Sequence, residues 1–212
     1  MQAIIFDCDG TLVESETLAN EVMVELVGEQ GLSLSTEYAL TQFRGAKMAD
    51  SVAHIENLLG RRLPDDFVPT LRARCEKAFR ARLHAVDGAL DLVRSLTVPF
   101  CVASSGPLEK MKLTLSVTEL LPYFEGRLFS SYEIGSWKPE PDLFLHAAQA
   151  LGVTAHACAV VEDSLPGIQA GIAAGMRVFA LQMHTANHEV PDGVTTISHL
   201  SDLRRFMDKA SC

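Results

Sequence analysis

The stretch Ala3-Ile4-Ile5-Phe6-Asp7-Cys8-Asp9-Gly10-Thr11 decides the fold, because a short apolar run ends there in two carboxylates. Ala3–Phe6 is apolar at every position, which is typical of a parallel strand covered by helices on both faces. Comparable short runs recur at residues 99–103, 127–129, 157–161 and 178–181. Segments with helical periodicity separate them, such as residues 143–151. This alternation predicts an α/β fold with a doubly wound parallel sheet of the Rossmann-like kind.

One long segment, residues 14–86, lacks any strand pattern. Leu18, Val22 and Leu26 have helical spacing there, and residues 71–83 are also typical of a helix. We therefore predict a helical cap domain at 14–86, inserted into an α/β core formed by residues 1–13 and 87–212.

Composition excludes several classes of protein. The chain has 212 residues, with 18 Lys and Arg against 27 Asp and Glu, so its net charge is −9. An acidic chain is a poor partner for nucleic acid, and no apolar run has the roughly 18 residues of a membrane span. Five cysteines without a C-x-x-C pair are typical of a reduced protein, and we predict a cytoplasmic location. No pattern sets an oligomeric state.

Polar residues gather where three of the predicted strands end. Asp7 and Asp9 follow the first strand, Ser104 and Ser105 the second, and Glu162-Asp163 the fourth. The carboxyl ends of parallel strands meet at one edge of a sheet, where ligands bind. Carboxylate oxygens are ligands that Mg²⁺ prefers, so we predict a magnesium site that would bridge the protein and substrate oxygens.

The same residues are suited to phosphoryl transfer. One carboxylate can act as a nucleophile and form an acyl-phosphate, and a carboxylate two residues further on suits a general acid and base. Ser104 precedes a helix that is predicted to start at Pro107, so its hydroxyl and the following amides can hold phosphate oxygens. Lys138, in a constrained Trp-Lys-Pro-Glu-Pro loop, can neutralise phosphoryl charge.

Together these motifs resemble the haloacid dehalogenase-like phosphohydrolases. The order Asp7-x-Asp9-Gly10-Thr11, Ser104, Lys138-Pro139 and Glu162-Asp163 matches the four motifs of that family over nearly the whole chain. The insertion resembles the small cap of β-phosphoglucomutase and the sugar-phosphate phosphatases. Residues 128–139 are similar to bacterial members of the 6-phosphogluconate phosphatase type.

The resemblance implies a role for each motif residue. Asp7 would be the nucleophile, and Asp9 would protonate the leaving group and then activate water. Ser104, Ser105 and Lys138 would bind the phosphoryl group. The Mg²⁺ ligands would come from Asp7, the Asp9 carbonyl and Asp163, with support from Glu162. The expected substrate is a small phosphorylated metabolite, a sugar phosphate or sugar-acid phosphate, with 6-phosphogluconate first among them.

The main alternative is a sugar phosphomutase. Mutases that resemble this chain place a His on the first cap helix, where this sequence has Ala19, and an Arg in the cap loop, where it has Met48. Both departures favour a hydrolase. A non-enzymatic binding module is a second alternative, but such proteins lose the nucleophile or the second Asp, and this chain keeps both.

Several other residues permit a functional or a structural interpretation. Arg44 and Lys47 lie in a Gly-containing cap loop and are predicted to bind an anionic substrate. Cys8 is interpreted as a buried filler, because on an extended chain it faces away from its two neighbours. The basic residues 72–82 are predicted to form a solvated helix face, and His184 and His188 a solvated pair.

Overall fold

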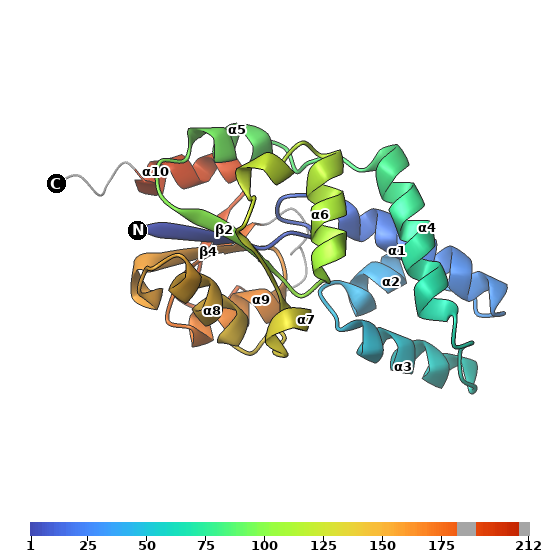
Figure 1. Ribbon diagram of the computed structural model, residues 1–212. Coiled ribbons are helices and arrows are strands. Elements are labelled where there is room, and N and C mark those ends of the chain that lie inside the picture. The colour runs from blue at the N-terminus through green and yellow to red at the C-terminus, as the bar shows by residue number, and fades with distance from the viewer. Residues whose placement is uncertain (182–189, 208–212) are drawn as a thin grey trace.

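The computed structural model describes residues 1–181 and 190–207, and its centre is a six-stranded parallel sheet in the order β3-β2-β1-β4-β5-β6. Helices cover both faces of this sheet, and a separate group of helices lies beyond one end of it (Figure 1). The predicted α/β fold with a doubly wound parallel sheet is therefore confirmed. His184 and His188 lie outside the described residues.

The strands lie close to where the apolar runs place them. Their bounds are β1 Ala3–Phe6, β2 Phe100–Ser104, β3 Leu128–Ser130, β4 Cys158–Glu162, β5 Arg177–Leu181 and β6 Thr195–Ile197. The sequence prediction misses β6, because only one of its three residues is buried and no continuous apolar run marks it. β6 lies at the edge of the sheet and pairs with β5, and an edge strand need not be apolar at every position.

Alternate residues of β1 show how both faces become buried. Ile4 and Phe6 belong to a core cluster with Leu92 of α5 (Ala89–Ser95), whereas Ala3 and Ile5 belong to a second cluster with Leu143 of α8 (Asp142–Ala150). All four β1 side chains are fully buried. A strand with two buried faces must be apolar at every position, which explains the sequence pattern.

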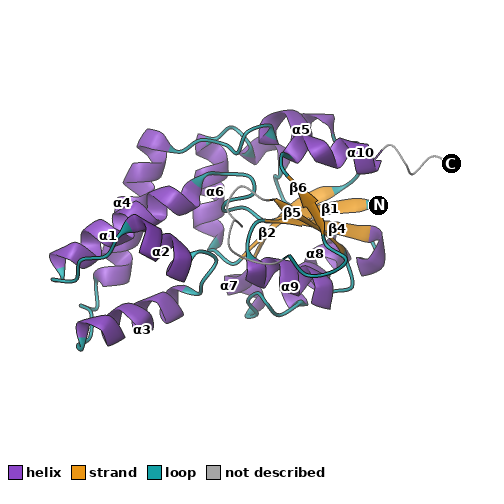
Figure 2. Cartoon of the chain, turned by 180° about the vertical axis from the view of Figure 1, so that it is seen from behind, coloured by secondary structure: helices purple, strands orange, loops and turns teal. Residues whose placement is uncertain are grey.

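Figures 1 and 2 show the layers that this pattern produces, with α5 and α10 on one side of the sheet and α8 and α9 on the other. The remaining core helices are α6 Leu108–Val117, α7 Ser131–Ile134, α9 Leu165–Ala173 and α10 Arg204–Met207, with 3₁₀ turns at Leu121–Tyr123, Ala155–Ala157 and Leu200–Leu203. No helix in residues 1–181 and 190–207 has both the length and the apolar character to cross a membrane.

The helical insertion consists of four helices. They are α1 Ser15–Glu29, α2 Thr36–Phe43, α3 Met48–Leu59 and α4 Phe67–Arg82. α1 packs against α2 and α4, and the group lies beside the sheet end that carries the polar loops (Figure 1). The two connecting segments bond to each other, with Val86 N donating to Leu12 O at 2.9 Å and Glu14 N to His84 O at 3.0 Å. The domain boundaries at residues 13/14 and 86/87 stay a prediction.

Close packing of α9 on the sheet depends on Gly171. A Cβ at this position would lie 2.7 Å from Val178 Cγ2 and 3.4 Å from Val160 Cβ, so the helix approaches β4 and β5 to within contact of its backbone. Gly171 thus serves helix-to-sheet packing. Gly175 differs, because it has φ +68° and open space around it.

We predict that Gly171→Leu lowers the free energy of unfolding by about 1–3 kcal/mol, the usual cost of forcing extra atoms into a packed core. Urea denaturation followed by circular dichroism measures this change. Gly28→Ala is the control, because Gly28 lies inside α1 with nothing within 4 Å, and it should leave stability equal or higher. Equal denaturation midpoints for Gly171→Leu and the unaltered protein would contradict the packing role.

Candidate active site

The strand register brings the predicted acidic residues together. In the pairing of β1 with β4, Phe6 lies opposite Val161, and Asp7 N donates to Val161 O at 2.9 Å. Asp7 and the pair Glu162-Asp163 therefore leave adjacent strands at the same edge of the sheet. Ser104 ends β2 on the other side of β1.

Three of these carboxylates form one buried cluster. Asp7, Glu162 and Asp163 each offer an oxygen within 4.8 Å of the others, and their exposed fractions are 6%, 0% and 3%. Lys138 is the cation beside them. Its ammonium donates to Asp7 Oδ1 and lies 2.6 Å from Glu162 Oε1, and its side chain is 3% exposed.

The protonation preferences of this cluster follow from burial. Burial raises the pKa of Asp7 to about 8, against the opposing charge of Lys138 and with the help of Glu162. Burial, followed by the charges of Glu162 and Asp7, raises the pKa of Asp163 well above its usual range. Burial disfavours charge on Lys138, but the carboxylates of Asp7 and Glu162 outweigh it and raise the pKa of that lysine. The single positive charge of Lys138 therefore does not balance the three carboxylates of the cluster.

The donor set fits a metal ion. Asp163 Oδ1 accepts a hydrogen bond from Thr11 Oγ1 at 3.2 Å, but Asp163 Oδ2 is buried with no hydrogen-bond partner. A buried carboxylate oxygen without a partner is costly unless a cation satisfies it. Gly10, with φ +83°, allows the first loop to lie against this carboxylate, because a Cβ there would lie 2.1 Å from Asp163 Oδ2. Three clustered carboxylates suit a hard divalent cation.

Glu162 is held by the start of α9. Its Oε2 accepts hydrogen bonds from Asp163 N at 3.0 Å, Ser164 N at 2.9 Å and Ser164 Oγ at 2.8 Å. Gly167 leaves the space that this requires, since a Cβ there would lie 1.8 Å from Glu162 Oε1. Glu162 therefore holds the loop before α9 through its Oε2, while its Oε1 contacts the ammonium of Lys138.

Asp9 has its own partners, and the sequence analysis did not single them out. Lys110 Nζ lies 2.9 Å from Asp9 Oδ1, and Ser15 Oγ donates to the same oxygen. Burial works to raise the pKa of Asp9, but the nearby ammonium of Lys110 prevails and the pKa falls below its usual value. The position of Lys110 in the first turn of α6, six residues after Ser104, was the signal that could have identified it.

Ser104 is the last residue of β2 and leads into a hydrogen-bonded loop. Its side chain is nearly fully buried, and its Oγ accepts a hydrogen bond from Gly106 N at 3.0 Å. Ser130, at the end of β3, donates to Gly106 O at 2.7 Å and thereby ties the loop to the neighbouring strand. Ser105 follows and lines the cavity beside Ser104. Helix α6 begins at Leu108 with Pro107 as its N-cap, one residue later than predicted.

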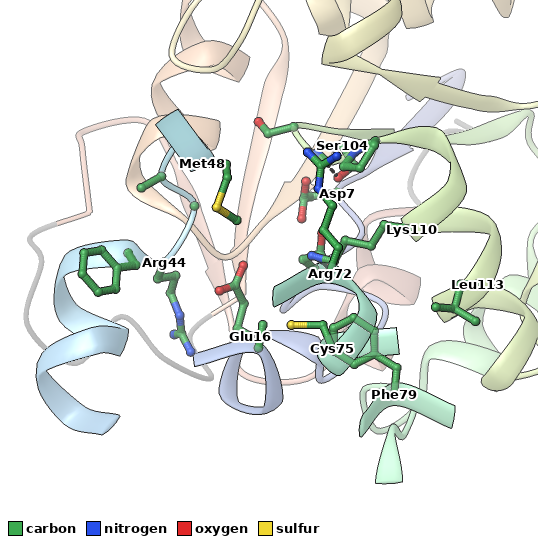
Figure 3. A pocket seen from close by; sticks show the side chains of 18 of the residues that line it. Asp7, Glu16, Arg44, Met48, Arg72, Cys75, Phe79, Ser104, Lys110 and Leu113 are labelled. Carbon is green, nitrogen blue, oxygen red and sulfur yellow. Dashed lines mark hydrogen bonds and ion pairs between the residues drawn. The ribbon is translucent and has the colours of Figure 1, made fainter. Parts of the chain in front are cut away.

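A cavity of about 770 Å³ separates the acidic cluster from the cap helices. Figure 3 shows Asp7 and Ser104 at one end of it, with Arg44 directly after α2, Met48 at the start of α3, and Cys75 and Phe79 on α4. Ala19, Arg44, Lys47 and Met48 all line this cavity. The structure thus brings both predicted cap cations to the space that the motif residues share.

The two cap cations have different surroundings. Lys47 is exposed, and its ammonium lies 4.1 Å from the ring centroid of Trp137. Arg44 faces Glu16, and its Nε is buried without a hydrogen-bond partner. Burial raises the pKa of Glu16 to about 7, although the charges of Lys110 and Arg44 act against this rise.

Cys8 takes no part in this cavity. Its side chain is fully buried in the core, and its Sγ lies 3.8 Å from Thr114 Oγ1. Burial raises the pKa of the Cys8 thiol well above its usual value, so the thiolate needed for nucleophilic attack is suppressed. The interpretation of Cys8 as a buried filler agrees with this position.

Residues 1–175 match the family model described as haloacid dehalogenase-like hydrolase, and the chain belongs to that family. The predicted family and enzyme class, a haloacid dehalogenase-like phosphatase, are thereby confirmed. The chain is 38% identical to 6-phosphogluconate phosphatase of Escherichia coli over 205 residues, which is 96% of this chain and 93% of that protein.

Solved structures agree with this membership. A haloacid dehalogenase-like protein from Agrobacterium tumefaciens is 30% identical with a TM-score of 0.82, and 98% of each chain is covered. A haloacid dehalogenase family hydrolase from Deinococcus radiodurans, which has bound phosphate and sodium, is 30% identical with a TM-score of 0.77. The comparison covers 98% of this chain and 95% of that one.

The raised pKa of Asp7 predicts how metal binding depends on pH. A carboxyl whose pKa rises from 3.8 to about 8 on folding stabilises the metal-free protein below pH 4 and loses that contribution as the pH approaches 8. A divalent cation must displace the proton, so its stabilising effect grows over the same range. We expect Mg²⁺ to raise the Tm more at pH 8 than at pH 6, measured by differential scanning fluorimetry.

Asp163→Asn is the control for this experiment, because it removes one carboxylate of the cluster and should abolish most of the Mg²⁺-induced rise in Tm. A rise that is equal at the two pH values, or larger at pH 6, would show that the cluster does not take up the cation.

Proposed function

We propose that this hydrolase is a Mg²⁺-dependent phosphatase that acts on a small phosphorylated metabolite, a sugar phosphate or sugar-acid phosphate, with 6-phosphogluconate as the leading substrate. The observation that carries the proposal is the buried cluster of Asp7, Glu162 and Asp163 beside Lys138, facing a cavity that the cap helices enclose. Similarity to the Escherichia coli phosphatase over nearly the full length of both chains supports the substrate class.

Asp7, Asp163, Glu162 and the backbone carbonyl of Asp9 would hold the Mg²⁺. When bound, the ion would supply positive charge to the carboxylates and to the phosphoryl oxygens. Ser104, Ser105 and Lys138 would bind the phosphoryl group, and Lys138 would keep Asp7 aimed at phosphorus through its contact with Asp7 Oδ1. In a phosphoryl transfer, this positioning and neutralisation of charge supply most of the catalysis.

The reaction would proceed in two steps on Asp7. An Asp7 oxygen attacks phosphorus, the ester P–O bond breaks, and the leaving alkoxide takes a proton from Asp9. Because Lys110 lowers the pKa of Asp9, this step requires the form of the enzyme in which Asp9 has first taken up a proton from solvent. Asp9 then takes a proton from water, whose oxygen attacks phosphorus, and the acyl-phosphate bond breaks to regenerate Asp7 and release phosphate. Lys110 and Ser15 both contact Oδ1 of the Asp9 carboxyl, and its other oxygen would serve the proton transfers.

The cap is what restricts the substrate to a small molecule. Helices α1 and α4 and the loop at 44–47 line the cavity, so a substrate must fit within about 770 Å³. A cap that closes over a small molecule would exclude water from the reacting atoms and obstruct a phosphoprotein. Arg44 and Lys47 in the cap loop are proposed to contact an anionic substrate.

The mutase alternative is disfavoured by the side chains that line the cavity. Ala19 and Met48 occupy the positions where the resembling mutases have a His and an Arg, and both line the cavity. Neither side chain can move a proton or bind a phosphate. Water is therefore the better acceptor for the phosphoryl group than a sugar hydroxyl.

We predict that Asp7→Asn lowers kcat for an aryl phosphate by on the order of a thousandfold or more, because an amide cannot form the covalent intermediate. Phosphate release in a coupled assay measures the loss, and circular dichroism checks the fold. Asp65→Asn, at an exposed position in the cap, is the matched control and should keep the activity. Activity of Asp7→Asn within about tenfold of the unaltered enzyme would refute the assignment of Asp7 as nucleophile.

A panel of sugar phosphates tests the substrate class. With Mg²⁺ present, we expect 6-phosphogluconate to show the highest kcat/KM in a phosphate-release assay, and excess EDTA to remove the activity. A mutase would instead convert one sugar phosphate to its isomer without releasing phosphate, which chromatography of the products detects. If 6-phosphogluconate is among the poorest substrates, the specific substrate is wrong while the phosphatase mechanism stands.

A further inference from the structure

Most cations around the cavity already have a carboxylate partner. Lys138 contacts Asp7 and Glu162, and Lys110 contacts Asp9. Further out, Arg80 pairs with Glu76 at 2.8 Å and Lys112 with Glu109 at 3.2 Å. An incoming anion would have to compete with these acids for the same side chains.

Arg72 is different from the other arginines of α4. Arg74, Arg80 and Arg82 form exposed ion pairs with Glu29, Glu76 and Glu21. Arg72 has no carboxylate partner among the residues that the structure describes, although the chain as a whole carries a net charge of −9. Arg72 is exposed, in agreement with the predicted solvated face, and it lines the cavity (Figure 3). Arg80 lines the cavity as well, but it is paired with Glu76.

The guanidinium of Arg72 is held from the core side of the cavity. Its Nη2 donates to the hydroxyl of Tyr132 at 3.4 Å, and its Cζ lies 5.9 Å from the centroid of the Tyr132 ring. Tyr132, on α7, is itself fixed edge-on against Trp137, with centroids 5.5 Å apart. A tyrosine orients a guanidinium without neutralising its charge, so the cation stays available to a ligand.

A guanidinium without a carboxylate partner is suited to bind the carboxylate of a ligand. Its planar fork of N–H donors matches the two oxygens of a carboxylate, and such charge-assisted pairs are stronger than neutral hydrogen bonds. The phosphoryl group would already be met at the Asp7 end by Ser104, Lys138 and the metal. Arg72 comes from the cap helix α4 and contacts Tyr132, and it is not one of the cations that hold the Asp7 carboxylate.

We propose that Arg72 recognises the second anionic group of the substrate, the carboxylate of a sugar-acid phosphate, and that Tyr132 positions its guanidinium. This inference rests on the proposed phosphatase function and names the residue that makes the enzyme prefer a sugar acid to a neutral sugar. Arg44 and Lys47 are less suited, because Arg44 faces Glu16 and Lys47 lies over Trp137.

The test compares two substrates that differ only in the proposed contact. 6-Phosphogluconate and glucitol 6-phosphate share a six-carbon chain and a phosphate, but the first ends in a carboxylate and the second in CH₂OH. The measured quantity is the ratio of their kcat/KM values. We expect Arg72→Gln to lower this ratio about 10- to 100-fold, the effect of losing a hydrogen bond to a charged group. Tyr132→Phe should lower it by a smaller factor.

Two variants serve as comparisons. Arg74→Gln removes a neighbouring arginine of the same helix that pairs with Glu29 outside the cavity, and it should leave the ratio unchanged. Arg44→Gln should lower the ratio less than Arg72→Gln does. An equal fall for both substrates in Arg72→Gln would mean that Arg72 contacts the phosphoryl group or only supports the fold, and this would overturn the inference. A larger change in Arg44→Gln would overturn it as well.

The unaltered enzyme separates failure of this inference from failure of the proposed function. If it hydrolyses both substrates with a ratio near one, carboxylate recognition is wrong while the phosphatase survives. If it releases phosphate from neither substrate nor from an aryl phosphate in the presence of Mg²⁺, the proposed function fails and this inference fails with it.

Discussion

Three buried carboxylates with one lysine among them are the constraint on which the rest of the structure depends. Asp7, Glu162 and Asp163 lie within 4.8 Å of one another, and burial raises the pKa values of both aspartates. Such an arrangement is unfavourable by itself, because like charges in a poorly solvated site repel each other. The strand register fixes the three side chains at the same edge of the sheet. A bound cation would offset the repulsion between their carboxylates. The cost in stability is thus tied to a capacity for binding metal.

The sheet and the loops around it provide the geometry that this cluster needs. The pairing of Phe6 with Val161 places the ends of β1 and β4 side by side. Glycine then allows the loops to close, with Gly10 against Asp163 and Gly167 against Glu162. A side chain at either glycine would occupy the space of a carboxylate. A substitution at either glycine would therefore change both the packing of the loops and the positions of the clustered carboxylates.

Sequence patterns predict the centre of the molecule better than its periphery. Strands with two buried faces produce continuous apolar runs, so β1, β2, β4 and β5 can be located closely, and the polar residues at their ends identify the site. β6 has one buried residue in three and leaves no such run. Lys110 and Tyr132 are also missed, since a lysine in a first helical turn and a tyrosine after a short strand usually face solvent. Their roles depend on how α6 and α7 meet the cap, which local periodicity does not encode.

The cap completes the site by changing the balance of charge around it. The core end of the cavity carries carboxylates, which a cation would stabilise. Helix α4 and the cap loop carry cationic side chains, which an anion would stabilise. Three arginines of α4 form ion pairs with glutamates at the surface, where each pair contributes little to stability. Arg72 lines the cavity and contacts the hydroxyl of Tyr132 in place of a carboxylate. In the proposed function, Lys138 and a bound cation would meet the phosphoryl group, and Arg72 would meet a second anionic group of the substrate.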